Sequence, residues 1–171
     1  MITRENHASY PPDRLLTDIR DEFQPGEKRL IVAAVLDGLE TDLQTPVGTY
    51  DHFDWVYLDS VSGARIYRQS VVFLLVTAVK ELYPEAEVIV RFTANKGLYC
   101  DINGFTAITP SIVSKIGERM KSIVAEDRPI IKRHLPREEA VALFKQSRQI
   151  AKANLIAAIP QETVSIYYCG I

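Results

Sequence analysis

The sequence predicts an α+β fold built from two modules. Its 171 residues suffice for one ordinary domain or two small ones, and 47% of them are hydrophobic, enough for a buried core. Short β-branched runs bounded by turn residues predict strands, and longer apolar segments with helical spacing predict helices. The charge balance changes along the chain: residues 1–60 carry 5 Lys and Arg against 12 Asp and Glu, whereas residues 61–171 carry 15 against 10. This break predicts that the modules meet near residues 60–63.

The first module follows a polar arm, residues 1–13, which is expected to be flexible. The dipeptide Asp37-Gly38 is typical of a hairpin turn and follows an apolar, β-branched run. These signals predict a small mixed sheet with one helix. Its expected elements are a helix over 15–23 and strands over 28–36, 40–43 and 55–58.

The strongest helix signal lies in RIYRQSVVFLLVTAVKELYP, residues 65–84. From Ser70 to Leu82, apolar residues occupy nearly every face, which predicts a helix surrounded by protein. Pro84 ends this helix, because the residue before a proline disfavours helical geometry. The stretch therefore predicts the central helix of the second module.

The rest of the second module alternates strands and helices. A hairpin is expected around the turn Asn95-Lys96-Gly97, and Thr109-Pro110 has the cap and first-position residues of a helix start. Pro136 opens a further helix, whose inward residues should include Ile150. The expected strands are 87–93, 98–102 and 163–169, and the helical stripe after Pro110 comprises Ile112, Val113, Ile116, Met120, Ile123 and Val124.

Several function classes lack their signals. The chain has neither a GxxxxGK[ST] phosphate loop nor a GxGxxG fingerprint. Its histidines, His7, His52 and His134, lack the i, i+4 spacing of a helical zinc pair, so no metal site is expected from them. No apolar run reaches the roughly 18 residues of a membrane span, and the first residues lack the apolar core of a signal peptide. We therefore expect a cytoplasmic protein without a membrane partner.

A basic cluster precedes and enters the predicted helix at Pro136. We interpret it as a solvated connector, because the chain has no overall basic excess and the cluster has no interleaved aromatic residues. A contact with RNA, a nucleotide or a neighbouring domain remains the alternative. The cluster comprises Arg128, Lys132, Arg133, His134 and Arg137.

Five collinear runs resemble the second, editing-type domain of threonyl-tRNA synthetase. They are QSVVFLLVTAVKELYPEAEV, NKGLYCDING, ITPSIVSKIGERMKSIVAEDRPI, PREEAVALFKQ and ETVSIYYCG. Upstream, VAAVLDGLETDLQTPV is similar to the small β-grasp module called a TGS domain. The resemblance implies a TGS-like β-grasp module over 14–62 and an editing-like α/β sandwich with a central buried helix over 63–171, the latter truncated at its C-terminal end.

The resemblance implies that the family's domain binds zinc in a pocket that hydrolyses mischarged tRNA. The zinc ligands of that domain are two helix histidines and a later Cys-x3-His. Gln69 and Phe73 stand at the two histidine positions, and neither side chain suits a zinc site of nitrogen and sulfur ligands. We therefore assign no catalytic residue and no metal ligand. Any remaining pocket, suited to a base or an amino acid, is expected to be lined by Gln69, Phe73, Arg91, Tyr99 and Asp101.

The same pair of modules resembles the N-terminal region of bacterial uridine kinase-like proteins, where an ATP-dependent P-loop domain follows. The leading hypothesis is a non-catalytic ligand-binding or regulatory region of such a nucleoside kinase. Its own C-terminal kinase domain would be its partner, a nucleoside, nucleotide or amino acid its ligand, and ATP and magnesium would belong to the kinase domain alone. The alternatives are a metal-free aminoacyl-tRNA editing hydrolase and a purely structural or dimerising module.

Overall fold

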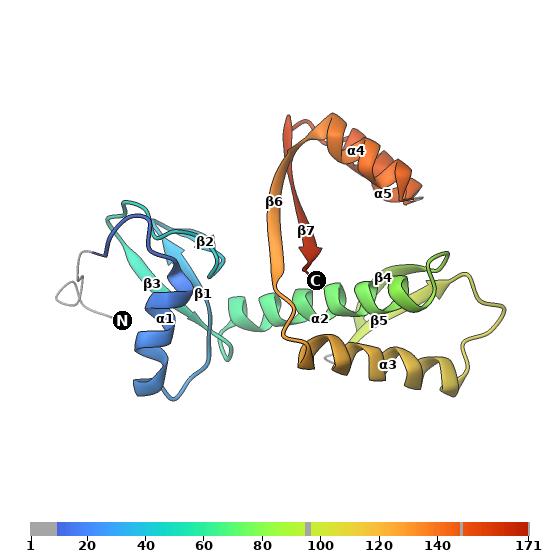
Figure 1. Cartoon of the computed structure of the whole chain (residues 1–171), viewed down its shortest axis with the longest axis horizontal. Helices are drawn as coiled ribbons and strands as arrows, with labels where there is room; N and C mark the ends of the chain where they lie inside the picture. Colours follow the sequence, from blue (N-terminus) through green and yellow to red (C-terminus); the bar gives the residue numbers. More distant parts are fainter. Residues whose placement is uncertain (1–9, 95–96, 148, 171) are drawn as a thin grey trace. The chain divides into compact units, whose positions relative to one another are not determined.

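The computed structural model describes residues 10–94, 97–147 and 149–170, and it confirms the predicted α+β class. Its helices and antiparallel sheets divide into two compact units, Met1–Ile116 and Gly117–Ile171. Helix α3 (Pro110–Ala125) spans this division (Figure 1). The domain limits expected from the sequence, with a boundary between residues 62 and 63, stay a prediction.

The N-terminal part of the first unit is a three-stranded antiparallel sheet with one helix. The strand order is β2-β1-β3, and Leu36 pairs with both Leu39 and Phe53. The predicted turn at Asp37-Gly38 is confirmed, with positive φ angles of 49° and 82° that suit a tight hairpin. The elements are α1 (Leu16–Phe23), a 3-10 turn η2 (Gln24–Gly26), β1 (Ile31–Leu36), β2 (Leu39–Thr41) and β3 (Phe53–Tyr57).

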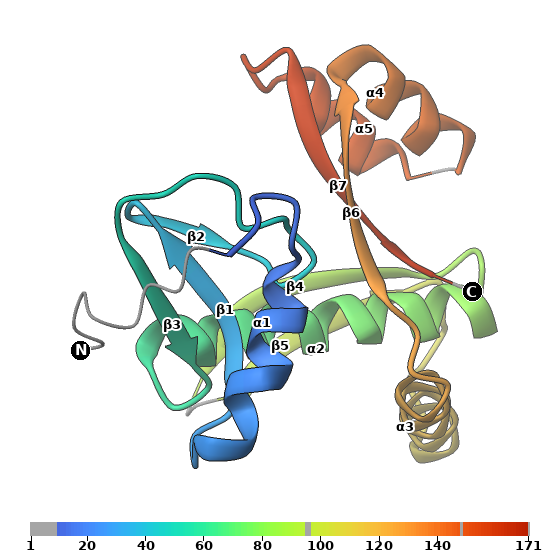
Figure 2. The same ribbon diagram turned by 60° about the vertical axis from the view of Figure 1, so that its left-hand side comes forward.

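Helix α1 packs on this sheet and closes its core, as Figure 2 shows. Leu16 and Ile19 lie on one face of the helix because they are three residues apart. They are buried together with Ile31, Ala34 and Trp55 of the sheet. Phe53 packs edge-on against Trp55, with ring centroids 4.6 Å apart. A sheet with one helix was expected for the first module, but the expected mixed sheet is wrong, because both strand pairs are antiparallel.

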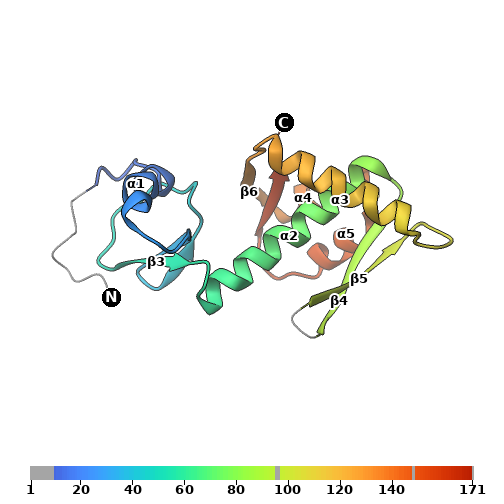
Figure 3. The same ribbon diagram turned by 90° about the horizontal axis from the view of Figure 1, so that it is seen from below.

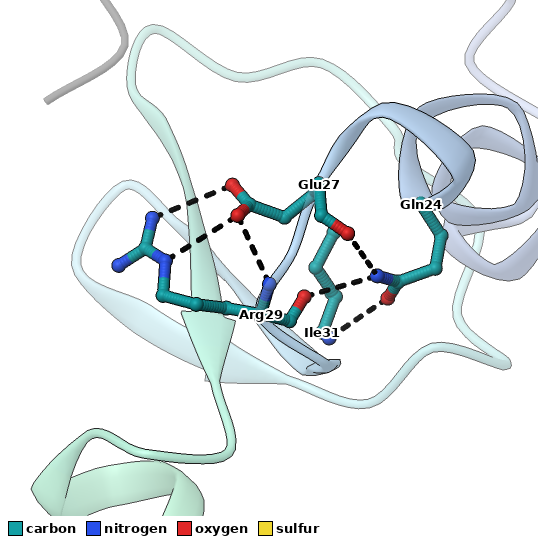
Figure 4. A network of polar contacts seen from close by, with 4 residues as sticks. All are labelled: Gln24, Glu27, Arg29 and Ile31. Carbon is teal, nitrogen blue, oxygen red and sulfur yellow. Dashed lines mark hydrogen bonds and ion pairs between the residues drawn. The ribbon is translucent and has the colours of Figure 1, made fainter.

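The Gln24 side chain connects the end of α1 to the start of β1 (Figure 4). Its amide nitrogen donates to the carbonyl oxygens of Glu27 and Arg29, and its amide oxygen accepts from the backbone N–H of Ile31 at 2.9 Å. The Arg29 guanidinium lies 3.6 Å from the centroid of the Tyr57 ring. One polar side chain thus satisfies three backbone groups between the end of α1 and the start of β1.

Helix α2 (Val61–Leu82) begins four residues before the stretch 65–84 that predicted it. Ser60 caps it: the hydroxyl of Ser60 accepts from the N–H of Gly63 at 3.0 Å and donates to the carbonyl of Tyr57 at 2.6 Å. Gly63 is buried, and a β-carbon there would lie 2.0 Å from the Tyr57 carbonyl oxygen. The chain therefore passes from β3 into α2 through a close backbone approach that requires glycine.

A hairpin of β4 (Glu87–Ala94) and β5 (Gly97–Asn103) follows, as predicted around Asn95-Lys96-Gly97. Residues 95 and 96 lie outside the described residues. Helix α2 contacts β4 and crosses the hairpin, as Figure 3 shows. Ala78 and Val79 of α2 are fully buried, whereas the surface of the helix near Tyr67 is exposed.

The second unit is a two-stranded antiparallel ribbon with two helices. Its elements are β6 (Ile130–Pro136), α4 (Arg137–Gln146), α5 (Ile150–Ala157) and β7 (Thr163–Cys169), after the end of α3. The final strand was predicted with these bounds. Three expectations are wrong: the basic segment is a strand rather than a connector, the helix after Pro136 is two helices, and Ile150 does not face inward. Ile150 starts the second helix and is 53% exposed rather than inward.

Candidate functional site

Two of the predicted pocket residues lie on helix α2. Gln69 and Phe73 are four residues apart, which places them on one face, one turn from each other. Gln69 is exposed and Phe73 is half-buried. The described residues contain no group of three or more His, Cys, Asp or Glu that could hold a metal ion, and no helix there is long and apolar enough to cross a membrane. This helix face therefore offers an amide and an aromatic ring.

The N-terminal turn of α2 is tied to the β1–β2 hairpin by a carboxylate. Glu40 accepts a hydrogen bond from the hydroxyl of Ser62 at 2.6 Å and forms an ion pair with Arg65. These two donors hold the pKa of the Glu40 carboxyl below its usual range, with the Ser62 bond as the larger cause. The start of the helix that carries Gln69 is thus fixed to the preceding sheet.

The other three predicted residues lie on the β4–β5 hairpin. The Nε of Arg91 donates to the Oδ2 of Asp101 at 2.6 Å, and both side chains are partly solvent-exposed. The pairing register shifts between Val90 and Phe92, so Arg91 is the extra residue of a β-bulge. Tyr99 stands two residues before Asp101 and therefore on the same face of β5. Arg91, Tyr99 and Asp101 thus share one face of the hairpin.

A fourth residue of this face, Phe92, was not predicted from the sequence. Its ring stacks on that of Tyr99, with centroids 5.1 Å apart and planes 6° from parallel. Phe92 is 58% exposed and Tyr99 57% exposed, so both rings of the stack are open to solvent. The signal was available: pairing Ala94 with Gly97 across the turn places Phe92 opposite Tyr99.

The five predicted residues thus form two sets, on α2 and on the exposed hairpin face. Arg91 and Asp101 pair with each other within the hairpin set, and Gln69 and Phe73 share one face of α2. A single pocket lined by all five stays a prediction.

The basic residues of the second unit have partners within the chain. Arg133 lies over the ring of Tyr168 at 5.3 Å, and the Nη1 of Arg137 donates to the carbonyl of Ile159 at 2.9 Å. His134 contacts the hydroxyl of Ser165, its cross-strand partner, at 3.2 Å. Arg128 pairs with Glu126 at the end of α3. These contacts give the cluster a role in holding the ribbon, and a contact with RNA stays a prediction.

Comparison with known proteins extends the resemblance over nearly the whole chain. The chain is 35% identical over 162 residues to "Threonine--tRNA ligase" of Bacillus velezensis, covering 94% of this chain and 25% of that protein. It is 37% identical over 154 residues to "Threonine--tRNA ligase 1" of Bacillus subtilis strain 168, covering 90% and 24%. It is 32% identical over 156 residues to the same ligase of Polynucleobacter asymbioticus, covering 91% and 24%. No family model matches the chain.

The chain thus spans about a quarter of the length of these relatives. The similarity supports the expected likeness to the N-terminal, editing-type region of threonyl-tRNA synthetase. It overturns the leading hypothesis of a regulatory region of a uridine kinase-like protein, because the relatives found are threonine–tRNA ligases. The nucleoside-kinase assignment is wrong, and ATP, magnesium and a kinase domain as partner lose their basis with it.

Proposed function

We propose that this chain is an editing-type region that acts on aminoacyl-tRNA and works without a bound metal ion. The observation that carries the proposal is the similarity to threonine–tRNA ligases over 94% of the chain, which includes both predicted modules. The ligand expected from the sequence was a nucleoside, a nucleotide or an amino acid. The charged end of an aminoacyl-tRNA contains a nucleotide and an amino acid together. A cytoplasmic location without a membrane partner belongs to the same proposal.

The reaction proposed is hydrolysis of the ester between the amino acid and the tRNA. Water attacks the ester carbonyl, the bond to the ribose oxygen breaks, and a free amino acid and a tRNA hydroxyl result. Without a metal to activate it, the water has to be oriented by hydrogen bonds, a task that a glutamine amide performs in other enzymes. Gln69 is the exposed amide at the position where the family resemblance places a histidine. We assign it the positioning of water, and Phe73 an apolar wall beside it.

A deacylation assay tests this proposal. The chain is incubated with a tRNA mischarged with a radiolabelled amino acid, with and without EDTA, and the remaining ester is counted over time. We expect faster loss of the ester than in buffer alone, unchanged by EDTA. Substitution Gln69→Ala should slow the reaction by at least about tenfold, as expected when a group that assists proton transfer or orients water is removed.

The matched control is Gln44→Ala, which removes an exposed glutamine amide from the loop after β2. Its rate should equal that of the unaltered chain. A deacylation rate no higher than in buffer would contradict hydrolysis by this chain. A rate abolished by EDTA and restored by zinc would contradict its independence of metal.

A further inference from the structure

The β6–β7 ribbon presents one face to its helices and one to solvent. Helix α4 contacts both strands, and Ile166 of β7, only 6% exposed, marks the inward face. Its two neighbours on β7, Ser165 and Tyr167, point the opposite way because successive strand residues alternate between faces; both are exposed, Tyr167 by 50%. Their cross-strand partners on β6 are His134 and Lys132. These four residues, Lys132, His134, Ser165 and Tyr167, form the outward ribbon face.

Strand pairing places an aromatic ring beside the basic side chains of β6. Lys132 lies directly opposite Tyr167, and His134 lies diagonally from it, so both are within reach of the ring. The Nδ1 of His134 lies 3.2 Å from the hydroxyl of Ser165. The basic segment was interpreted as a solvated connector partly because it has no interleaved aromatic residue in the sequence. The ribbon removes that reason, because Tyr167 comes from the other strand.

The charge of the ribbon decides what kind of partner fits. Neither strand contains Asp or Glu, and β6 contributes Lys132 and Arg133. The nearest carboxylates along the chain lie beyond the ends of the two strands, at residues 126–127, 138–139 and 162. A positively charged strand pair fits an anionic partner, and an exposed ring beside it offers a stacking surface for a base. Phosphates and unpaired bases occur together in single-stranded nucleic acid.

A second exposed aromatic surface, the stack of Phe92 on Tyr99, suits nucleic acid less well. Each ring there already covers one side of the other, with planes 6° from parallel. The cross-strand register places Glu87 on the same face as Asp101. These two carboxylates outnumber the guanidinium of Arg91, so the face repels phosphates. The ribbon is therefore the better surface for an anionic strand.

We propose that the outward ribbon face binds single-stranded RNA. Tyr167 stacks on an unpaired base, Lys132 binds the adjoining phosphate, and the hydroxyl of Ser165 offers a hydrogen-bond partner to a ribose 2′-hydroxyl. The choice of RNA rests on the proposed function, whereas binding itself requires no ester hydrolysis, so either can fail while the other stands. One stacking position beside one lysine is a small site, and its dissociation constant should be on the order of 10–100 μM.

Fluorescence anisotropy with a fluorescein-labelled oligoadenylate of about eight nucleotides tests the proposal. The chain is titrated from about 1 to about 500 μM, a range that brackets the expected constant. Tyr167→Ala should raise the dissociation constant at least about fivefold, because one base loses its stacking partner. The matched control is Tyr67→Ala on α2, where Tyr67 is 57% exposed; this variant should bind like the unaltered chain. Far-UV circular dichroism confirms that each variant is folded.

The salt dependence of binding tests the role of Lys132. Lys132→Gln should weaken binding and lower the slope of log K against log salt by about 0.7, the value for one phosphate of a single strand. The matched control is Lys145→Gln, which alters an exposed lysine of α4 and should leave the affinity and the slope unchanged.

The form of the nucleic acid separates base stacking from general attraction to phosphates. The same RNA annealed to oligouridylate should bind at least about fivefold more weakly, because its bases are already stacked. The corresponding DNA should also bind more weakly, because it lacks the 2′-hydroxyl. Lack of binding at about 500 μM would overturn the proposal. Equal affinity for the duplex or the DNA would also overturn it, as would an affinity lost in Tyr99→Ala and kept in Tyr167→Ala.

Discussion

The substitution Gly63→Ala tests how the first sheet is joined to helix α2. Gly63 lies in the first turn of α2, and its α-carbon faces the backbone of the preceding strand end. An added β-carbon would lie 2.0 Å from the carbonyl oxygen of Tyr57 and 2.8 Å from the α-carbon of Leu58. The Tyr57 carbonyl cannot move away freely, because it accepts hydrogen bonds from the N–H and the hydroxyl of Ser60.

The size of the effect follows from two opposing contributions. Replacing glycine by alanine inside a helix normally stabilises it by about 1 kcal/mol. Here the backbone has to shift by about 1.4 Å, from 2.0 Å to the 3.4 Å of an ordinary contact. Overpacking against backbone atoms costs about 3 kcal/mol. The net expectation is a loss of about 2 kcal/mol in the free energy of unfolding, or about 4–8 °C in Tm.

Thermal and urea unfolding followed by circular dichroism measure this loss. The matched control is Gly117→Ala in helix α3, where an added β-carbon has no neighbour within 4 Å. That variant should gain up to about 1 kcal/mol, because only the helix preference changes. If Gly63→Ala proved as stable as the unaltered chain, or as Gly117→Ala, the close approach of α2 to Tyr57 would be refuted.

Three further substitutions probe the first module. Gln24→Ala should lower stability by about 1–2 kcal/mol, because the N–H of Ile31 loses its acceptor, whereas Gln44→Ala should leave urea unfolding unchanged. Trp55→Ala should cost about 3–5 kcal/mol in the same assay, because Trp55 is only 7% exposed. Glu40 has a lowered pKa in the folded chain, so its contribution is present at neutral pH and is lost as pH falls through that pKa. Melting curves between pH 7 and pH 3 should therefore decline less for Glu40→Gln; an equal decline would contradict the contacts with Ser62 and Arg65.

Local sequence signals predicted much of the fold. The turn dipeptide Asp37-Gly38 and the final strand at 163–169 were recognised because turn chemistry and β-branched runs act over a few residues. The early start of α2 was missed because Gly63 disfavours a helix by itself and is required there only by the approach of Tyr57. Strand β6 was missed because it is exposed along most of its length and carries charged residues, so its pairing with β7 left no hydrophobic pattern.

The candidate site, too, could be predicted only in part from local sequence signals. The loss of the zinc ligands stays a prediction from the sequence, made because Gln69 and Phe73 fall at the two histidine positions when the helix is aligned by its AVKELYP end. The ion pair of Arg91 with Asp101 depends on a bulge that shifts the register by one residue, which strand alternation does not predict. The stack of Phe92 on Tyr99 could have been found by counting back from the turn. The nucleoside-kinase assignment was wrong: the relatives found are threonine–tRNA ligases, and that similarity extends over most of the chain rather than lying in any local pattern.

The proposed metal-independent action on aminoacyl-tRNA is tested most directly by a single-turnover deacylation assay. The chain is in excess over a mischarged tRNA, the buffer contains EDTA, and the rate of ester loss is measured. The predicted result is a rate above that of tRNA in the same buffer, unchanged when zinc is supplied in place of EDTA and reduced at least about tenfold by Gln69→Ala. A rate equal to that of buffer alone, or one that appears only with zinc, would contradict it.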